Sequence, residues 1–510
     1  MLHRSSQRWS KENKMMSIDK IISSLIAYAL RNKFIDSQDE IYCTNRLLEL
    51  FQCETYRKTD SDSNIDNVMK EALNYAVQKK LRSFENQNEI DCFDALIMDT
   101  ILPRPSQVIT KFNHLYHQSP KIATDWYYDL AIKSRYVRKD RLAKNIMYSY
   151  HRHDIDLVIT INLSKPEKDP KEIARLRSTP SSSYPKCLLC KENEGYYGSY
   201  SHPGRSNHRI IPLSLGDEDF FLQYSPYGYF NEHCIILKKE HVPMAITSNT
   251  FKQFVDFVDK FPHYLIGSNA DLPIVGGSIL SHEHFQGGRY EFPLNRASDL
   301  WQFKLLEFPA CQFSILNWPM SVIKIRTTKS DELISASTNI LLKWRNYTDV
   351  ESEIVAAELD GTMHNTITPI LRQQNGVYEM YLVLRNNNTS ARYPDGIFHP
   401  HPKLHHIKKE NIGLIEVMGL AILPGRLKKE LAECRKYLLD TGNNRIDDSI
   451  QKHVSWLNEI KLKYSIDDKN VDSILKDEVA LAFSQVLKDS GVFKMNKQGN
   501  CSFKKFISTL

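Results

Sequence analysis

Apolar residues near the N-terminus recur with the spacing of an amphipathic helix. After Ser17, the positions at i, i+3, i+4, i+7, i+8 and i+11 are Ile18, Ile21, Ile22, Leu25, Ile26 and Ala29. This spacing places one continuous apolar stripe on a helix. The pattern stays mostly helical, with charged faces and few glycines, up to about residue 175. Residues 158–163 are the exception, because their β-branched side chains favour a strand.

From about residue 220 the pattern changes to short apolar runs. Residues 220–224, 234–237 and 378–384 are predicted strands, and turn-forming residues 225–228 separate the first two. Helical spacing returns over residues 250–261, and residues 273–280 predict a buried strand with a glycine pair. Such a mixture predicts an α+β fold built on an antiparallel sheet.

These patterns divide the chain into four parts. We expect an unstructured extension (1–15), a mainly helical N-terminal region (16–175), an α+β module (176–330) and a second α+β module that ends in helices (331–510). The Ser- and Pro-rich residues 177–185 mark the second boundary. The two α+β blocks could be distant duplicates, although the sequence itself contains no visible repeat.

Composition and charge exclude several classes of protein. Apolar residues make up 41% of the 510 residues and charged residues 25%, which is typical of a folded globular protein and not of a disordered one. The 67 Lys+Arg and 61 Asp+Glu leave a net charge of only +6, and both signs are dispersed along the chain. A dedicated nucleic-acid binder would concentrate basic residues, so we expect no nucleic-acid partner. A local anion site remains open.

Cysteine usage and hydropathy indicate the compartment. The nine cysteines are an odd number and are scattered, so a disulfide framework is not expected. No run of about 18 apolar residues is long enough to cross a membrane. The polar residues 1–14 lack the apolar core of a signal peptide. We therefore expect a cytoplasmic protein without membrane association.

Residues 281–288 carry the most specific chemistry of the chain. In an extended segment His282, His284 and Gln286 would project on one side, because side chains alternate between faces. A neutral imidazole is a competent nucleophile toward phosphorus. A neighbouring amide donates hydrogen bonds to phosphoryl oxygens. Glycine pairs on both sides of the segment, at 276–277 and 287–288, would let the backbone approach a phosphate.

The segment 277–288 resembles the signature of the galactose-1-phosphate uridylyltransferases. Within that family the chain is similar to the longer, second type found in Gram-positive bacteria. Further segments that match are 184–196, 202–212, 361–366 and 409–419. The family belongs to the histidine-triad superfamily, so the resemblance implies histidine-triad-like antiparallel sheet modules. In that superfamily His-x-His-x-Gln marks nucleotidyl transferases, whereas a third histidine marks hydrolases.

The resemblance implies an exchange of uridylyl groups between hexose phosphates. UDP-glucose would uridylylate His284 and release glucose-1-phosphate. Galactose-1-phosphate would then take the uridylyl group from His284 and leave as UDP-galactose. Gln286 carries over as the donor to phosphoryl oxygens, and an amide cannot act as an acid or base that activates water. No organic cofactor is implied. The family precedent is a dimer, so a homodimer is expected.

Cys187 and Cys190 have the spacing of one half of a zinc site. Taken alone, a reduced surface pair or a redox motif would be comparably consistent, although no thioredoxin-like pattern surrounds them. The resemblance implies that Cys187, Cys190, His241 and His282 bind a structural zinc. The histidine-rich residues 399–406 do not map onto a family metal site, and a solvated loop is expected there.

Substrate contacts follow mainly from the resemblance. Arg205 and Asn207 lie in a predicted loop that suits phosphate binding; for the neighbouring Arg209 an ordinary charged turn is an equal alternative. By family position, the ribose and phosphates would contact Asn269, Gly277 and Ser278, and the hexose would contact Glu416. Tyr224 and Tyr227 could stack on uracil, but core packing is the alternative for each.

Two other functions agree less well with the same residues. A dinucleoside polyphosphate hydrolase or phosphorylase of the same superfamily is disfavoured by Gln286 and by the matching segments outside the motif. A zinc-stabilised nucleic-acid-binding protein would need clustered basic residues with interleaved aromatics, and would leave the aligned His282, His284 and Gln286 without a role.

Overall fold

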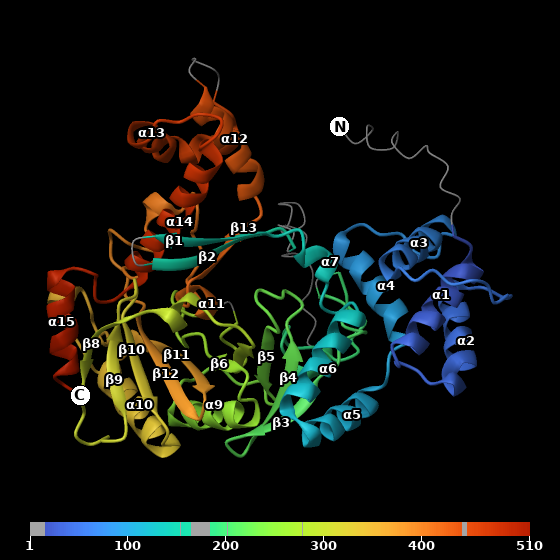
Figure 1. Cartoon of the computed structure of the whole chain (residues 1–510), viewed down its shortest axis with the longest axis horizontal. Coiled ribbons are helices and arrows are strands. Elements are labelled where there is room, and N and C mark those ends of the chain that lie inside the picture. Colours follow the sequence, from blue (N-terminus) through green and yellow to red (C-terminus); the bar gives the residue numbers. More distant parts are fainter. Residues whose placement is uncertain (1–15, 153–154, 165–183, 201, 278, 441–445) are drawn as a thin grey trace.

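The computed structural model describes residues 16–152, 155–164, 184–200, 202–277, 279–440 and 446–510. Figure 1 shows a helical block at the N-terminal side, a long central sheet, a small sheet above it and C-terminal helices at the top and at the far edge. The expected extension, residues 1–15, lies outside the described residues, as does most of the Ser- and Pro-rich segment.

The N-terminal region is helical, as the apolar spacing predicts. Its first helix, α1, begins after Ser17, whose side-chain oxygen accepts from the Lys20 N–H and caps the helix. The residues of the predicted stripe are buried, apart from Ile18, which is half-buried. The helices of this region are α1 (Ile18–Arg31), α2 (Glu40–Phe51), α3 (Ile65–Gln78), α4 (Gln87–Asp99), α5 (Pro105–Gln118), α6 (Pro120–Lys133) and α7 (Lys139–Leu142), with a short 3-10 turn η1 (Ser37–Asp39).

A three-stranded sheet follows the helical block. The predicted strand at 158–163 is present as part of β2 (Ile155–Asn162), which pairs antiparallel with β1 (Ile146–Arg152). The third strand, β13 (Leu420–Pro424), comes from a distant part of the chain and pairs parallel with β2. The predicted division at residue 175 therefore separates segments that the small sheet joins.

Ten strands form the central sheet, and their order repeats. The order is β3-β4-β5-β7-β6-β11-β12-β10-β9-β8. If the five strands of each half are numbered along the chain, their order from the outer edge of the sheet to its middle is 1-2-3-5-4 in both halves. Each half also has one helix between its third and fourth strands. The first half comprises β3 (Ile211–Leu215), β4 (Glu218–Tyr224), β5 (Cys234–Lys238), α9 (Ser248–Lys260), β6 (Leu265–Gly267) and β7 (His284–Gly288); the second comprises β8 (Asp299–Phe303), β9 (Gln312–Leu316), β10 (Val322–Thr327), α10 (Ser330–Arg345), β11 (Asn365–Gln374) and β12 (Val377–Asn386).

The duplication of the two halves is therefore visible in the strand order, although no repeat is visible in the sequence. The two halves meet where β6 and β11 pair antiparallel, with Ile266 opposite Leu371. The second half begins at β8, so the expected boundary at residue 330 falls inside it. We propose that the module boundary lies between β7 and β8. The α+β class and the antiparallel sheet are as the sequence predicts.

The two faces of the central sheet have different coverings. α9 and α10 pack on one face, where Phe285, Ile323 and Leu371 belong to the large core. The opposite face packs against a second core that includes the small sheet and the C-terminal elements (Figure 1). Of the C-terminal helices, α11 (Leu414–Val417), α14 (Val471–Ser490) and the start of α12 (Leu427–Leu439) contribute to this second core. α13 (Val454–Lys463) packs with α12 and α14 in a small third core, and α15 (Lys497–Ile507) packs on the large core. The remaining 3-10 turns of the chain are η2 (Lys191–Asn193), η3 (Pro293–Arg296), η4 (Val350–Ser352), η5 (Pro402–Leu404) and η6 (Asp448–His453).

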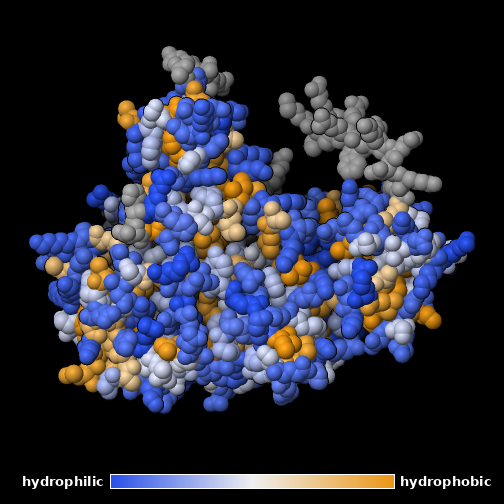
Figure 2. Space-filling model, in the orientation of Figure 1, coloured by the Kyte–Doolittle hydropathy of each residue, from blue (hydrophilic) through white to orange (hydrophobic). Residues whose placement is uncertain are grey.

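The face of the molecule drawn in Figure 2 is mostly hydrophilic. On the face drawn in Figure 2, hydrophobic residues form small separate groups among hydrophilic ones. Among the helices of the described residues, none combines the length and the apolar character that crossing a bilayer requires.

Candidate active site

Four potential metal ligands converge from three segments. Cys187 and Cys190 lie in the loop before η2, His241 follows β5, and His282 precedes β7. The ligand atoms of these four residues all lie within 4.8 Å of one another. Asn193 holds the cysteine loop by donating from its amide to the main-chain oxygens of Cys187 and Cys190, at 2.9 and 2.8 Å. The fold thus gathers the four residues that the resemblance implies.

The spacing and the donor set fit a tetrahedral metal ion. Cys187 Sγ lies 3.5 Å from Cys190 Sγ and 3.3 Å from His282 Nδ1, and Cys190 Sγ lies 3.1 Å from His241 Nδ1. Zinc bonded to sulfur and nitrogen would separate its ligands by about 3.3–3.8 Å. His282 Nε2 donates to the Lys238 main-chain oxygen at 2.8 Å, which leaves Nδ1 free as a metal ligand.

His284 occupies the first position of β7, beside β5. Its Nδ1–H donates to the His282 main-chain oxygen at 2.8 Å, so the unprotonated Nε2 keeps its lone pair. Burial lowers the pKa of this imidazole to about 4, so the ring is neutral at physiological pH. The neighbouring Phe285 points to the other face, where it stacks on Phe220 at 5.6 Å. His284 therefore has the tautomer and charge of a nucleophile.

Gln286 is held by a residue that the sequence reasoning missed. His233 Nε2 donates to Gln286 Oε1 at 3.0 Å, which directs the Gln286 amide protons elsewhere. His233 is itself buried, burial lowers its pKa to about 4, and its ring packs against Tyr229 and Phe230. The only sequence signal for this role was its position immediately before the predicted strand at 234–237, which pairs with β7.

The glycine-containing segment before the motif is a loop, not the predicted strand. Residues 273–275 form a turn, Gly276 makes an isolated bridge with Ala270, and residues 277, 279 and 280 belong to no strand. A Cβ on Gly276 would lie 2.5 Å from the main-chain oxygens of Ala270 and Leu272, so the chain packs too closely for any other residue. Apolar composition alone does not distinguish such a tight loop from a buried strand.

Of the predicted substrate residues, Asn269, Gly277 and Glu416 lie near the face of the sheet that carries His284 and Gln286. Asn269 Oδ1 accepts from the Leu414 N–H at 2.8 Å, which ties it to α11. A Cβ on Gly277 would lie 2.6 Å from Asn269 Nδ2. Glu416 lies in α11, where it is buried and paired with Lys408 Nζ at 2.5 Å. Ser278 lies outside the described residues.

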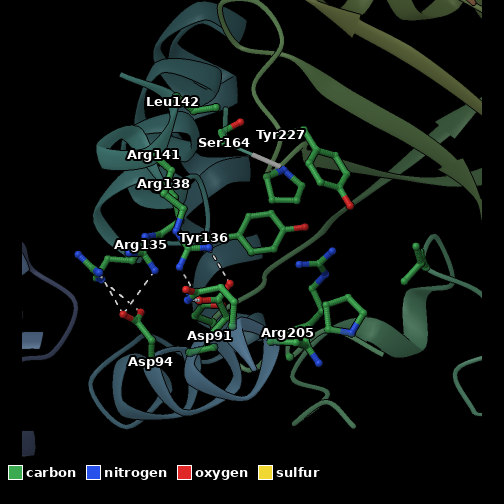
Figure 3. Close-up of a pocket in the computed structure, with 18 of the residues that line it drawn as sticks. Asp91, Asp94, Arg135, Tyr136, Arg138, Arg141, Leu142, Ser164, Arg205 and Tyr227 are labelled. Carbon is green, nitrogen blue, oxygen red and sulfur yellow. Dashed lines mark hydrogen bonds and ion pairs between the residues drawn. The ribbon is translucent and has the colours of Figure 1, made fainter. Parts of the chain in front are cut away.

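Arg205 lines a separate cavity of about 360 Å³, shown in Figure 3. Three other arginines of this cavity have carboxylate partners: Arg141 bonds to Asp91 at 2.6 Å, Arg135 to Asp94 at 3.0 Å and Arg138 to Asp140 at 2.9 Å. Arg205 lies over the ring of Tyr136, at 5.4 Å, and no ion pair to a carboxylate is recorded for it within the described chain. It is therefore the arginine of this cavity best able to accept an anionic ligand.

The cavity approaches the candidate active site through two residues. Leu188, between the two cysteines of the metal cluster, lines it, and so does Tyr227. Tyr227 stacks on Tyr229 at 5.9 Å, which contacts His233 in turn. Asn207 also lines the cavity, but its amide donates to the Ser134 main-chain oxygen at 2.8 Å. Tyr224 belongs to the core and hydrogen-bonds to Tyr264.

Two expectations about polar segments need correction or refinement. Arg209 is buried and bonds to Asp99 and to three main-chain oxygens, so it is a structural residue. The histidine-rich residues 399–406 do not form the expected solvated loop, because His399 and His406 are buried. His399 contacts Asn411 and His406 contacts His453. Within the described ranges this segment supplies no cluster of metal ligands.

Comparison with known proteins identifies the family of the chain. Two family models match the chain: galactose-1-phosphate uridyl transferase, N-terminal domain, over residues 33–243, and its C-terminal domain over residues 256–457. The galactose-1-phosphate uridylyltransferase of Clostridium acetobutylicum is 49% identical over 97% of this chain and 100% of its own length. The chain belongs to the galactose-1-phosphate uridylyltransferase family.

Other uridylyltransferases of this family are nearly as similar. The protein of Lactococcus lactis is 46% identical over 97% of this chain and 99% of its own, and that of Staphylococcus carnosus is 45% identical over 94% and 98%. A solved structure, yeast Ap4A phosphorylase Apa2, matches with a TM-score of 0.32 and 12% identity over 58% of this chain and 88% of that chain. A match this weak carries no argument about fold or function.

The boundary between the two uridylyltransferase family models differs from the boundary between the two halves of the central sheet. The C-terminal model begins inside α9, so it contains β6 and β7 with His284 and Gln286. The cysteines and His241 belong to the N-terminal model. The candidate metal site of this family member therefore joins the two matched regions.

Proposed function

We propose that the protein exchanges UMP between UDP-glucose and galactose-1-phosphate. His284 Nε2 attacks the α-phosphorus of UDP-glucose, the bond from that phosphorus to the bridging oxygen breaks, and glucose-1-phosphate leaves with this oxygen. A phosphate oxygen of galactose-1-phosphate then attacks the same phosphorus, the N–P bond breaks and UDP-galactose forms. The observation that carries the proposal is the Nδ1–H bond to the His282 oxygen, which leaves Nε2 as the nucleophilic nitrogen.

Gln286 and His233 act on the phosphoryl oxygens in this proposal. Because His233 occupies the amide oxygen of Gln286, the amide N–H groups are the ones available to the uridylyl phosphate. An amide activates no water, so the uridylyl-histidine persists until a sugar phosphate arrives. His282 positions the nucleophile, since its main-chain oxygen is the acceptor for His284. His282, His284 and Gln286 are thus assigned to one catalytic unit.

We also propose that Cys187, Cys190, His241 and His282 bind a structural zinc ion. Two thiolates and two imidazoles are a common zinc donor set, and three distances between their ligand atoms, 3.1–3.5 Å, are close to those of a tetrahedral site. Bound zinc supplies a rigid link between the cysteine loop and the strand that carries His284. No organic cofactor enters the proposal.

For the nucleotide we propose the cavity that Arg205 lines. Arg205 would bind phosphate oxygens, with Asn207 and Tyr227 beside the nucleoside. Asn269, Gly277 and Ser278 would contact the ribose and phosphates, and Glu416 would accept hydroxyls of the hexose. We propose further that the protein is a cytoplasmic homodimer; light scattering would distinguish the mass of one chain from that of two.

The test uses UDP-glucose labelled in its uridine. Incubation with the wild-type protein should give labelled protein and one equivalent of glucose-1-phosphate, and added galactose-1-phosphate should discharge the label as UDP-galactose. His284→Ala should abolish both products. His117→Ala, on the exposed surface of α5, is the matched control and should behave as wild type. Turnover without any labelled protein would contradict the covalent route.

A further inference from the structure

Arg385 projects from the same face of the central sheet as His284 and Gln286. In the strand registers Gln286 is opposite Gly267, Gly267 is opposite Ile370, and Ile370 is opposite Tyr381. Residues directly opposite each other share a face, and side chains two positions apart on a strand share it too. Arg385 is four positions beyond Tyr381 on β12, and His284 is two positions before Gln286 on β7.

The guanidinium of Arg385 is buried without an acidic partner. The residue is 1% exposed, and within the described residues its side chain donates from Nη1 to Thr368 Oγ1 at 3.3 Å. Its Nε has no acceptor in the described part of the chain. Burial lowers its pKa to about 10, so the group remains charged at neutral pH. A buried cation with unused donors is costly unless an acceptor completes it.

Two other arginines on this face have the partner that Arg385 lacks. Arg372 on β11 and Arg326 on β10 lie opposite Glu379 in the registers. Their guanidinium groups reach that carboxylate at 2.7 and 3.1 Å. No carboxylate lies within 4 Å of Arg385 among the residues with described positions. The free donors of Arg385 are therefore particular to its place in the sheet.

The acidic group that acts electrostatically on Arg385 already has its own partners. Glu416 acts electrostatically on Arg385, but its carboxylate is held by Lys408 Nζ at 2.5 Å and by the Gly413 N–H at 3.1 Å. Glu416 also acts electrostatically on Tyr229, whose ring contacts the partner of Gln286. Arg385 and Glu416 therefore lie on one side of the space above this sheet face, and Gln286 lies on the other side of it.

We propose that Arg385 binds the phosphate group of the hexose-1-phosphate. It binds this group both when the hexose-1-phosphate is the acceptor and when it is the leaving half of a UDP-hexose. This inference rests on the proposed function. Three strand spacings, roughly 14 Å, separate the backbones of β7 and β12. That distance leaves room for a hexose phosphate between a histidine and an extended arginine. A dianionic acceptor that approaches an anionic uridylyl group needs a compensating cation, and a guanidinium matches phosphate geometry.

A binding experiment tests the proposal without turnover. The melting temperature of the wild-type protein should rise with galactose-1-phosphate and with inorganic phosphate, but not with galactose. Arg385→Met should melt at or above the wild-type temperature without ligand, because it removes an uncompensated buried charge. It should show no rise with either phosphate. Arg372→Met is the matched control: it should melt lower, because Glu379 loses a partner, but keep the phosphate-dependent rise.

A kinetic experiment separates this inference from the proposed function. In Arg385→Met, kcat/KM for galactose-1-phosphate should fall about 100-fold, and Arg385→Lys should recover part of the loss. A wild-type protein that transfers no uridylyl group would refute the proposed function. Normal transfer by wild type together with unchanged phosphate response and kcat/KM in Arg385→Met would refute the Arg385 inference alone. A lower melting temperature of ligand-free Arg385→Met with retained phosphate binding would assign Arg385 a structural role and also refute it.

Discussion

The two halves of the central sheet have the same strand order and different chemistry. In the first half β7 presents His284 and Gln286, and the loop after β5 supplies His241 to the metal cluster. In the second half β12 occupies the same place in the order but presents Val383 and Arg385 on that face. The strand order repeats because it is a stable way to cover one sheet with helices. The proposed nucleophile lies in one half only, so the two halves differ in their side chains and connections and not in strand order.

The connections explain why the first half of the sheet, and not the second, supplies a loop histidine to the candidate metal site. Residues 239–247 join β5 to α9 and include His241, whereas only residues 328–329 join β10 to α10. The shorter connection cannot reach across the face of the sheet. The second half instead places α11 and Glu416 over its strands. One half thus holds the reacting phosphorus, in our proposal, and the other holds the hexose phosphate.

The largest expected effect is at His284. His284→Ala should lower the transfer rate at least about 10⁴-fold, since alanine supplies no nitrogen in place of the proposed nucleophile Nε2. Digestion and mass spectrometry of the uridylylated wild-type protein should locate the label in residues 281–288. A label in residues 365–386 would show that the second half has a nucleophile of its own, and the comparison would fail.

Next in size is the loss of the metal cluster. Cys187→Ser should remove bound zinc and lower both the melting temperature and the transfer rate, the latter about 10- to 100-fold, because His282 loses its anchor. Elemental analysis and calorimetry measure the two effects. Cys311→Ser, at a buried cysteine of the second half, should retain the zinc. Equal zinc content in all three proteins would remove Cys187 from the proposed site.

A smaller effect is expected at His233. His233→Phe should lower kcat about 10-fold with little change in KM, because the Gln286 amide loses the bond that orients it and the ring volume is kept. Steady-state kinetics with galactose-1-phosphate separate the two parameters. His233→Asn, which can still donate to Gln286, should recover part of kcat. A rise in KM alone would mean that His233 acts on substrate binding instead.

The smallest effect on turnover is expected at the junction of the halves. A Cβ on Gly267 would lie 2.7 Å from the Leu414 side chain, so Gly267→Val should lower the free energy of unfolding by about 1–3 kcal/mol. Denaturant titration measures this loss, and the residual folded protein should keep most of its activity. Gly376→Asn, at the exposed turn between β11 and β12, is the control and should change stability little. Independent unfolding of the two halves in wild type would show that the junction does not couple them.

Local spacing predicted much of the fold and the chemistry. The stripe from Ile18 to Ala29 is the buried face of α1, because helical period and burial are both local properties. The alternation around His284 placed Phe285 and the histidine on opposite faces, as β7 shows. Residues 273–280 show where this reasoning fails, since an apolar run with glycines fits either a strand or a tight loop.

By itself, the sequence predicted the amphipathic helices, the α+β class and the alignment of His282, His284 and Gln286, which depend on residue type and short-range spacing. The full set of four candidate metal ligands came from the family resemblance, because His241 and His282 lie far along the chain from the two cysteines. Only the tertiary structure decided which strands are neighbours, that β13 joins β2, that His233 holds Gln286 and that Arg385 is buried with no carboxylate partner among the described residues. These facts depend on pairings between residues far apart in the chain, where many registers are compatible with the same local pattern and burial selects one.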